Sequence, residues 1–102
     1  MRMDSHPSSP AIRAADAVLE ERRRQIEQFG HEPATDDRLP RCWLLRQAHT
    51  RLLDASDLVT GRATPAELQR ARRKTIQAAA LCLAEIDRID RQLTSERTEN
   101  DQ

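Results

Sequence analysis

The residues of this chain whose types suit chemistry are mainly carboxylates in stretches with helical spacing. Glu20 and Glu21 are neighbours in one stretch, and Glu85, Asp87 and Asp90 follow in another. Carboxylate oxygens are the ligands that Mg²⁺ prefers, and facing helices can hold a metal ion inside a bundle. Because 33% of the residues are charged, solvated helix faces would produce the same groupings. We therefore predict no resident metal or cofactor and keep a Mg²⁺ site as the alternative.

Arginines form the second group, since they make up 16 of the 17 basic residues. Genome base composition would explain this bias, and so would the use of arginine for bidentate contacts to carboxylate or phosphate. Arg22 interrupts an apolar stripe, and because a buried charge needs a partner, we predict an ion pair with Glu85. The residues that we expect to contact a binding partner are Arg23, Arg24, Arg70, Arg73 and Lys74, with Glu27, Asp36 and Asp37 as acidic counterparts.

Several classes of function lack the residues that they need. The three histidines have no metal-ligand spacing, and the two cysteines are single and far apart. No glycine-rich phosphate loop and no G-x-S-x-G motif is present, so no catalytic residues are predicted. The formal net charge is zero and only two residues are aromatic, which argues against direct binding of nucleic acid.

The ends and the apolar runs of the sequence bear on its compartment. The first residues, MRMDSHPSSP, lack the apolar segment of a secretory signal. The longest apolar run, residues 78–84, is too short to cross a bilayer. We therefore expect a cytoplasmic protein that has no contact with a membrane.

Three helices are expected to position these residues. The first begins at Ser9 and Pro10 and ends at Gly30, and the second spans about residues 41–60. The third begins at the capping box TPAE, Thr64 to Glu67, and continues to residue 93. The stripes expected to face the core are Ile12, Ala15, Leu19, Ile26 and Phe29 in the first helix, Leu44 or Leu45, Ala48, Leu52, Ala55 and Val59 in the second, and Leu68, Ala71, Thr75, Ala78, Cys82, Ile86, Ile89 and Leu93 in the third.

These elements predict an all-α fold, an antiparallel three-helix bundle with a long C-terminal helix. Residues 9–93 form a single helical domain in this prediction, between a disordered N-terminus at 1–8 and a disordered tail at 94–102. The polar RARRK segment at the start of the third helix is expected to project beyond the core. A homodimer that pairs exposed ends of the stripes is compatible with this architecture, because small alanine-rich cores are marginal alone.

Two segments of the chain, ERRRQIEQFG with the following P..DD and AAALCLAEIDRIDR, resemble a family of small proteins encoded by phages and prophages. Members of that family pair an E-R-x-R-Q-I helix and a G-x-x-P-x-x-D-D loop with a C-terminal A-A-L-x-x-A-E-I-x-R-x-D-R helix. The resemblance covers about residues 18–37 and 73–91, and the middle of the chain departs from it. It implies an accessory protein of a bacterial host's cytoplasm, without a settled biochemical role.

A more distant similarity is to MazG-like all-α nucleotide pyrophosphohydrolases, which bind Mg²⁺ with E-E-x-x-E and E-x-x-D helices. In this chain Arg24 stands where the third glutamate of the first motif would fall, and Asp87 to Asp90 read D-x-x-D. The residues to which this similarity would assign Mg²⁺ are Glu21, Glu85, Asp87 and Asp90.

The function that we expect first is non-catalytic binding of a host protein or ribonucleoprotein complex. Because small phage proteins often block a host system, the specific expectation is an inhibitor of an antiviral defence complex of the CRISPR type. The alternative is Mg²⁺-dependent hydrolysis of a nucleoside triphosphate to the monophosphate and pyrophosphate, or a degenerate relative of such an enzyme.

Overall fold

The computed structural model describes residues 9–29, 40 and 42–100, and most of these residues lie in helices. The helices are α1 (Pro10–Phe29), α3 (Trp43–Val59) and α4 (Pro65–Asn100). The described residues include no strand, so the prediction of an all-α fold is confirmed. None of these helices is long and apolar enough to cross a membrane.

The connection between α3 and α4 follows from local sequence signals. Gly61 has a φ of +79°, a conformation that glycine adopts without the strain a Cβ would add. Thr64 and Glu67 form the predicted capping box, because the Glu67 backbone N–H donates to Thr64 Oγ1 at 3.1 Å. In return, the Thr64 backbone N–H donates to Glu67 Oε1 at 2.8 Å. These reciprocal bonds satisfy amides that have no partner within the helix and fix the start of α4.

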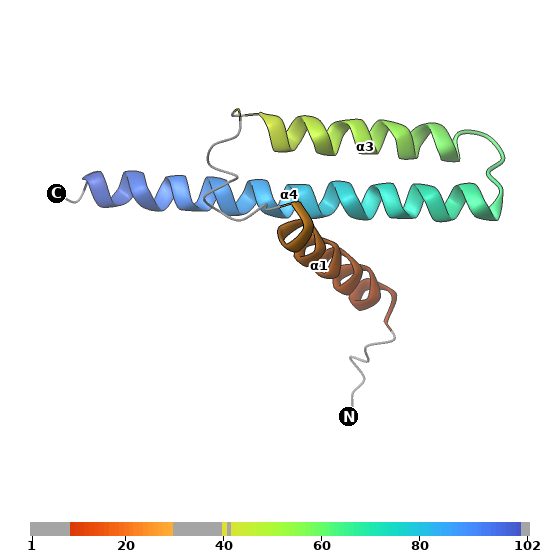
Figure 1. Ribbon diagram of the computed structural model, residues 1–102, viewed down its shortest axis with the longest axis horizontal. Coiled ribbons are helices and arrows are strands. Elements are labelled where there is room, and N and C mark those ends of the chain that lie inside the picture. The colour runs from red at the N-terminus through yellow and green to blue at the C-terminus, as the bar shows by residue number, and fades with distance from the viewer. Residues whose placement is uncertain (1–8, 30–39, 41, 101–102) are drawn as a thin grey trace, which may run out of the picture.

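Helices α3 and α4 lie side by side and run in opposite directions (Figure 1). Their buried core is small and consists of Leu44 and Ala48 from α3 with Ala78, Leu81 and Ala84 from α4. Trp43 and Cys82, which are partly buried, pack against this cluster. Small alanine side chains let two helix backbones approach closely, which suits a tight helical hairpin.

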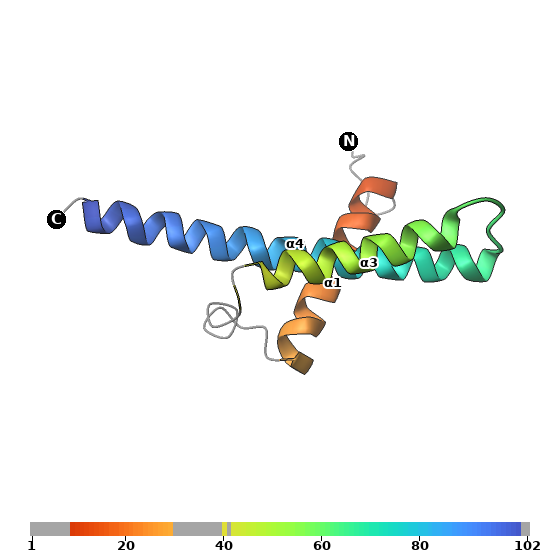
Figure 2. The same cartoon turned by 90° about the horizontal axis from the view of Figure 1, so that it is seen from above.

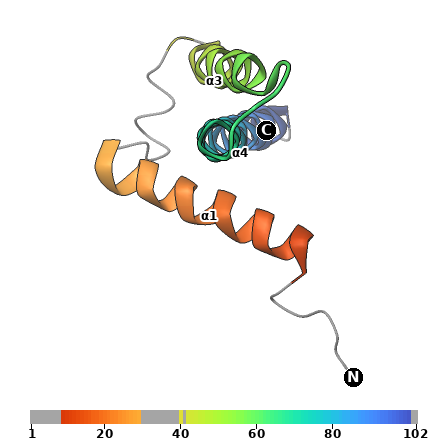
Figure 3. The same cartoon turned by 90° about the vertical axis from the view of Figure 1, so that its right-hand side faces the viewer.

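Helix α1 packs on α4, on the side away from α3, and crosses it at a steep angle (Figures 2 and 3). At the crossing, Gln25 Nε2 donates to the backbone oxygen of Gln77 at 3.4 Å. The three helices are therefore not aligned as the expected antiparallel bundle, and only the α3–α4 pair has that arrangement. The stripe predicted for α1 does not form its packed face either, because Leu19 is exposed and the polar Gln25 is buried.

The interior is built from smaller residues than the predicted stripes contain. Among the described apolar residues of α3 and α4, two leucines and six alanines are buried: Leu44, Leu81, Ala48, Ala55, Ala71, Ala78, Ala80 and Ala84. The large apolar side chains that remain exposed are Leu19, Leu45, Leu52, Leu53, Val59, Leu68, Ile86, Ile89 and Leu93. Of the predicted stripe residues, Leu44, Ala48, Ala55, Ala71 and Ala78 are buried, whereas the buried Ala80, Leu81 and Ala84 were not predicted.

The part of α4 that projects is its C-terminal part, not the RARRK segment, which lies along α3 (Figure 1). The helix also continues to Asn100, through residues 94–100 that the sequence analysis placed in a disordered tail. Side chains on this segment bond within the helix, as Thr94 Oγ1 does with the backbone oxygen of Asp90 at 3.0 Å. A polar segment can extend an existing helix in this way, because the unfavourable nucleation step has already taken place in the preceding turns.

Candidate binding cleft

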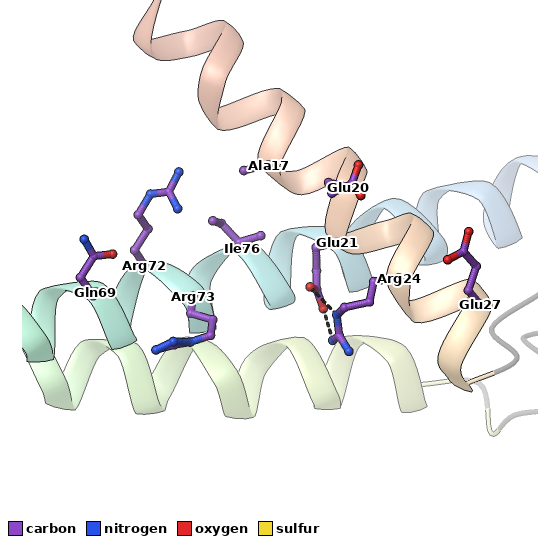
Figure 4. Close-up of a pocket in the computed structure, with 9 residues that line it drawn as sticks. All are labelled: Ala17, Glu20, Glu21, Arg24, Glu27, Gln69, Arg72, Arg73 and Ile76. Carbon is purple, nitrogen blue, oxygen red and sulfur yellow. Dashed lines mark hydrogen bonds and ion pairs between the residues drawn. The ribbon is translucent and has the colours of Figure 1, made fainter.

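A charged cleft of about 480 Å³ lies where α1 crosses α4 (Figure 4). Helix α1 supplies its acidic residues and one arginine, and α4 supplies two further arginines. We call this hollow the charged cleft. Its lining residues are Ala17, Glu20, Glu21, Arg24, Glu27, Gln69, Arg72, Arg73 and Ile76.

A second hollow, of about 320 Å³, adjoins the charged cleft and shares Glu21 and Arg24 with it. Trp43, Gln47 and Arg51 of α3 line its other side. Arg51 is held on its own helix, since its guanidinium donates to the backbone and side-chain oxygens of Gln47, each at 3.1 Å. The side chains of all three helices thus meet around Glu21 and Arg24.

Glu21 and Arg24 form a bidentate ion pair within the charged cleft. Arg24 Nε donates to Glu21 Oε1 at 2.8 Å, and Arg24 Nη2 donates to the other carboxylate oxygen, which makes the pair bidentate. Arg24 also donates to Gln28 Oε1 at 2.8 Å, so its guanidinium has a defined orientation. The hydrogen bonds from Arg24 lower the pKa of Glu21, against the opposing effect of burial. The charges of Arg24 and Arg51 and a bond from Gln25 lower that pKa further.

Gln25 lies beneath this pair and is only 4% exposed. Its Nε2 donates to Glu21 Oε2 at 3.3 Å as well as to Gln77. Its amide oxygen is buried and accepts no hydrogen bond. Only the bond to Gln77 reaches α4, and at 3.4 Å it is long, so this buried amide with one unsatisfied oxygen holds α1 on α4 only weakly.

The basic wall of the cleft consists of Arg72 and Arg73 in one turn of α4, and Arg70 lines a neighbouring hollow with Arg73. All three arginines are exposed, and no carboxylate among the described residues forms an ion pair with them. Lys74 differs, because its Nζ lies 3.6 Å from Asp54 Oδ2 on α3. Unpaired guanidinium groups in water keep their capacity for bidentate bonds to a carboxylate or phosphate that arrives from outside.

The structure brings together part of the predicted contact set. Arg24, Glu27 and Arg73 line the charged cleft, and Arg73 also lines a neighbouring hollow with Arg70, Lys74 and Gln77. Arg23 lies apart, on the outer side of α1, and pairs with Glu20 across an exposed 3.3 Å contact. Asp36 and Asp37 fall outside the described residues.

The sequence analysis did not select Arg72 as a contact residue. The sequence did contain an indication of this residue, since Arg72 belongs to the RARRK run. Arg72 also lies one helical turn before Ile76, which lines the cleft as well. What the sequence could not supply was the position of α1, which determines the face of α4 that forms the cleft.

The carboxylates that the resemblance would assign to Mg²⁺ each have a neighbouring arginine or lie apart. Glu85 accepts two hydrogen bonds from Arg88, each at 2.9 Å, and Asp87 accepts one from Arg91 at 3.0 Å. In the described ranges, no three histidine, cysteine or acidic side chains come close enough to hold a metal ion. A Mg²⁺ site at these four positions therefore stays a prediction. The ion pair between Arg22 and Glu85 stays a prediction.

No known protein family, curated protein or solved structure matches this chain.

Proposed function

We propose that this chain is a non-catalytic binding protein that holds a partner protein at the charged cleft. The observation that carries the proposal is the pair of cleft arginines, Arg72 and Arg73, which have no ion-pair partner among the described residues. Arginine is enriched at protein interfaces, where its planar group bonds carboxylates and backbone oxygens. An acidic segment of a partner would supply the carboxylates that this pair lacks.

The mixture of charges in the cleft favours a protein over a nucleic acid as the partner. Glu20, Glu21 and Glu27 of α1 line the same cleft as Arg72 and Arg73 of α4. A phosphate backbone repeats one sign of charge, so these carboxylates would repel it along part of its path. A protein surface can present both signs, with acidic residues against α4 and basic residues against α1.

The nature of the partner rests on the resemblance to small phage and prophage proteins. We propose a protein or ribonucleoprotein complex of the bacterial host, with a CRISPR-type defence complex as the specific candidate. Binding of this kind would take place in the host cytoplasm and needs no cofactor. We further infer that the protein binds as a homodimer, through a surface other than the cleft.

The test is affinity capture from a lysate of the bacterium that carries the gene, followed by mass spectrometry. We expect the wild-type protein to retain a stoichiometric partner and the variant Arg72→Glu/Arg73→Glu to lose it. The matched control is Arg46→Glu/Arg62→Glu, which changes the net charge equally at exposed residues outside the cleft. Equal retention by both double variants would contradict the proposal.

One outcome would favour the enzyme alternative. If no partner is retained, and the protein hydrolyses a nucleoside triphosphate when Mg²⁺ is added, the MazG-like enzyme activity replaces partner binding as the proposed function. A Mg²⁺-dependent rise in melting temperature with bound nucleotide would accompany that result, since a ligand that binds only the folded state stabilises it.

A further inference from the structure

A further hollow, of about 310 Å³, lies beside the charged cleft, between α4 and the N-terminal half of α1. Arg72 and Ile76 line both the charged cleft and this hollow, so the two spaces share a border. We call it the apolar hollow, because Arg72 is the only charged residue that lines it. Its lining residues are Ala14, Val18, Arg72, Thr75, Ile76 and Ala79.

Helical spacing explains the walls of the apolar hollow. Its residues on α4 are three and four positions apart, and its two residues on α1 are four positions apart, so each set forms one helix face. Thr75 is polar, but its hydroxyl donates to the backbone oxygen of Ala71 at 2.8 Å. The hydroxyl therefore needs no partner from the hollow, and the walls offer mainly apolar surface.

The crossing of α1 and α4 leaves this apolar surface without a cover. Two helices that cross steeply touch over a short length and then diverge, as α1 and α4 do (Figures 2 and 3). Among the described residues of α1, only Gln25 is buried. Val18 and Ile76 are only partly buried, so an apolar group placed between the helices would remove more of their surface from water.

The charge at the border restricts what can fill the apolar hollow. Arg72 is exposed and has no ion-pair partner among the described residues, and its side chain lies on the side of α4 that α1 crosses (Figure 4). A purely apolar occupant would displace water from this guanidinium without replacing its hydrogen bonds, which is unfavourable. An occupant that carries a carboxylate beside its apolar group would bond the guanidinium instead.

We propose that the apolar hollow and Arg72 together bind a segment of the partner protein in which a large apolar side chain lies close to an aspartate or glutamate. The apolar side chain fills the hollow and the carboxylate bonds Arg72. This proposal rests on the proposed function, because the carboxylate enters at the border of the charged cleft. It adds the source of affinity, since exposed ion pairs contribute little and a buried apolar anchor contributes more.

The size of the apolar hollow agrees with such an anchor. A volume of about 310 Å³ is at the small end of the range for ligand pockets. It suits one large side chain, such as leucine, methionine or phenylalanine, and the shared border places the neighbouring carboxylate at the cleft arginines.

The test begins with selection of binding peptides from a displayed library of random sequences on the immobilised full chain. We expect the enriched peptides to share a large apolar residue within one helical turn of an aspartate or glutamate. Acidic peptides without a shared apolar residue would overturn this proposal and leave the cleft proposal standing. Apolar peptides without an acidic residue, or no enrichment over the bare surface, would also overturn it.

Fluorescence anisotropy of the most enriched peptide then locates its apolar side chain. Ala14→Trp fills the hollow and should weaken binding by about 10- to 100-fold, the range for one large apolar side chain that is no longer buried. The matched control is Ala15→Trp, at a neighbouring exposed alanine that lines neither space, and it should bind as the wild-type protein does. Alanine at the shared apolar position of the peptide should weaken binding to the wild-type protein but not further to Ala14→Trp.

Circular dichroism checks that the variants stay helical, and Thr75→Trp replaces Ala14→Trp if that variant loses helix. Equal binding of the peptide by Ala14→Trp and Ala15→Trp would overturn the proposal. If Arg72→Glu/Arg73→Glu abolishes binding while Ala14→Trp does not, only the cleft proposal survives. A wild-type dimer that Ala14→Trp dissociates would assign the hollow to a second copy of the chain and would also overturn the proposal.

Discussion

Replacement of Leu44 by alanine tests the packing of the α3–α4 hairpin. Leu44 is 2% exposed and is one of the few large residues in the core, where its neighbours are mainly alanines. The substitution removes three buried carbons at about 0.8 kcal/mol each, or about 2.4 kcal/mol of transfer free energy. A residual cavity adds to this cost, because alanine neighbours have no long side chains with which to fill it, and the expected total is about 3 kcal/mol.

The loss should be large for a protein of this size. A small domain has about 5–15 kcal/mol of stability in all, and each kcal/mol shifts the melting temperature by about 4–8 °C. We therefore expect Leu44→Ala to lower the melting temperature by about 15 °C. The assay is thermal and urea unfolding, followed by circular dichroism and by the fluorescence of the single tryptophan, Trp43, which packs against the same core.

The control for this prediction is Leu53→Ala, at a leucine that is 53% exposed on the outer face of α3. It should cost less than about 1 kcal/mol, because little apolar area leaves the interior. Both variants must be compared at one protein concentration, since dimer formation would couple stability to concentration. Equal melting temperatures for Leu44→Ala and the wild-type protein would refute the packing described for the hairpin.

Three further predictions follow from local contacts. Thr64→Ala removes the side-chain acceptor of the capping box and should cost about 1 kcal/mol in urea unfolding, and no change would mean that this cap is unimportant. Gln25→Glu places a second carboxylate beside Glu21 in a buried position and should lower the free energy of unfolding by about 3 kcal/mol. Gln25→Leu removes the unpaired oxygen and should change the free energy of unfolding by less than about 1 kcal/mol. The lowered pKa of Glu21 means that its ionised form stabilises the fold above its usual value of 4.5 and that this contribution is lost as the pH falls through the lower folded-state pKa. The stability difference between the wild-type protein and Glu21→Gln should therefore shrink in acid, and a difference that does not depend on pH would contradict this assignment.

Much of the secondary structure could be predicted from the sequence because its signals are local. Proline at the first position of α1 and α4, the capping box at Thr64 and the glycine at position 61 each act within one turn of the chain. The positions of the helices were therefore predicted closely. The end of α4 was missed, since polar residues after Leu93 look like a tail but extend a helix that has already formed.

The arrangement of α1 could not be predicted, because it depends on contacts between segments far apart in the sequence. A periodic apolar row indicates a buried face but does not say at what angle two helices cross. In α1 the row that includes Leu19 is not the packed face, and the polar Gln25 meets α4 instead. The charged cleft exists only because of this crossing, so Arg24, Glu27 and Arg73 were predicted as contact residues while Arg72 and the grouping of these residues were not.

Hydrogen–deuterium exchange of the captured complex shows whether a partner binds at the charged cleft. We expect slower exchange, relative to the free protein, in peptides that cover residues 17–28 of α1 and 69–77 of α4. Exchange in the outer face of α3, around Leu53, should stay unchanged. Unchanged exchange in both cleft peptides, with slowing confined to α3 or to the C-terminal end of α4, would mean that the partner does not bind at the cleft.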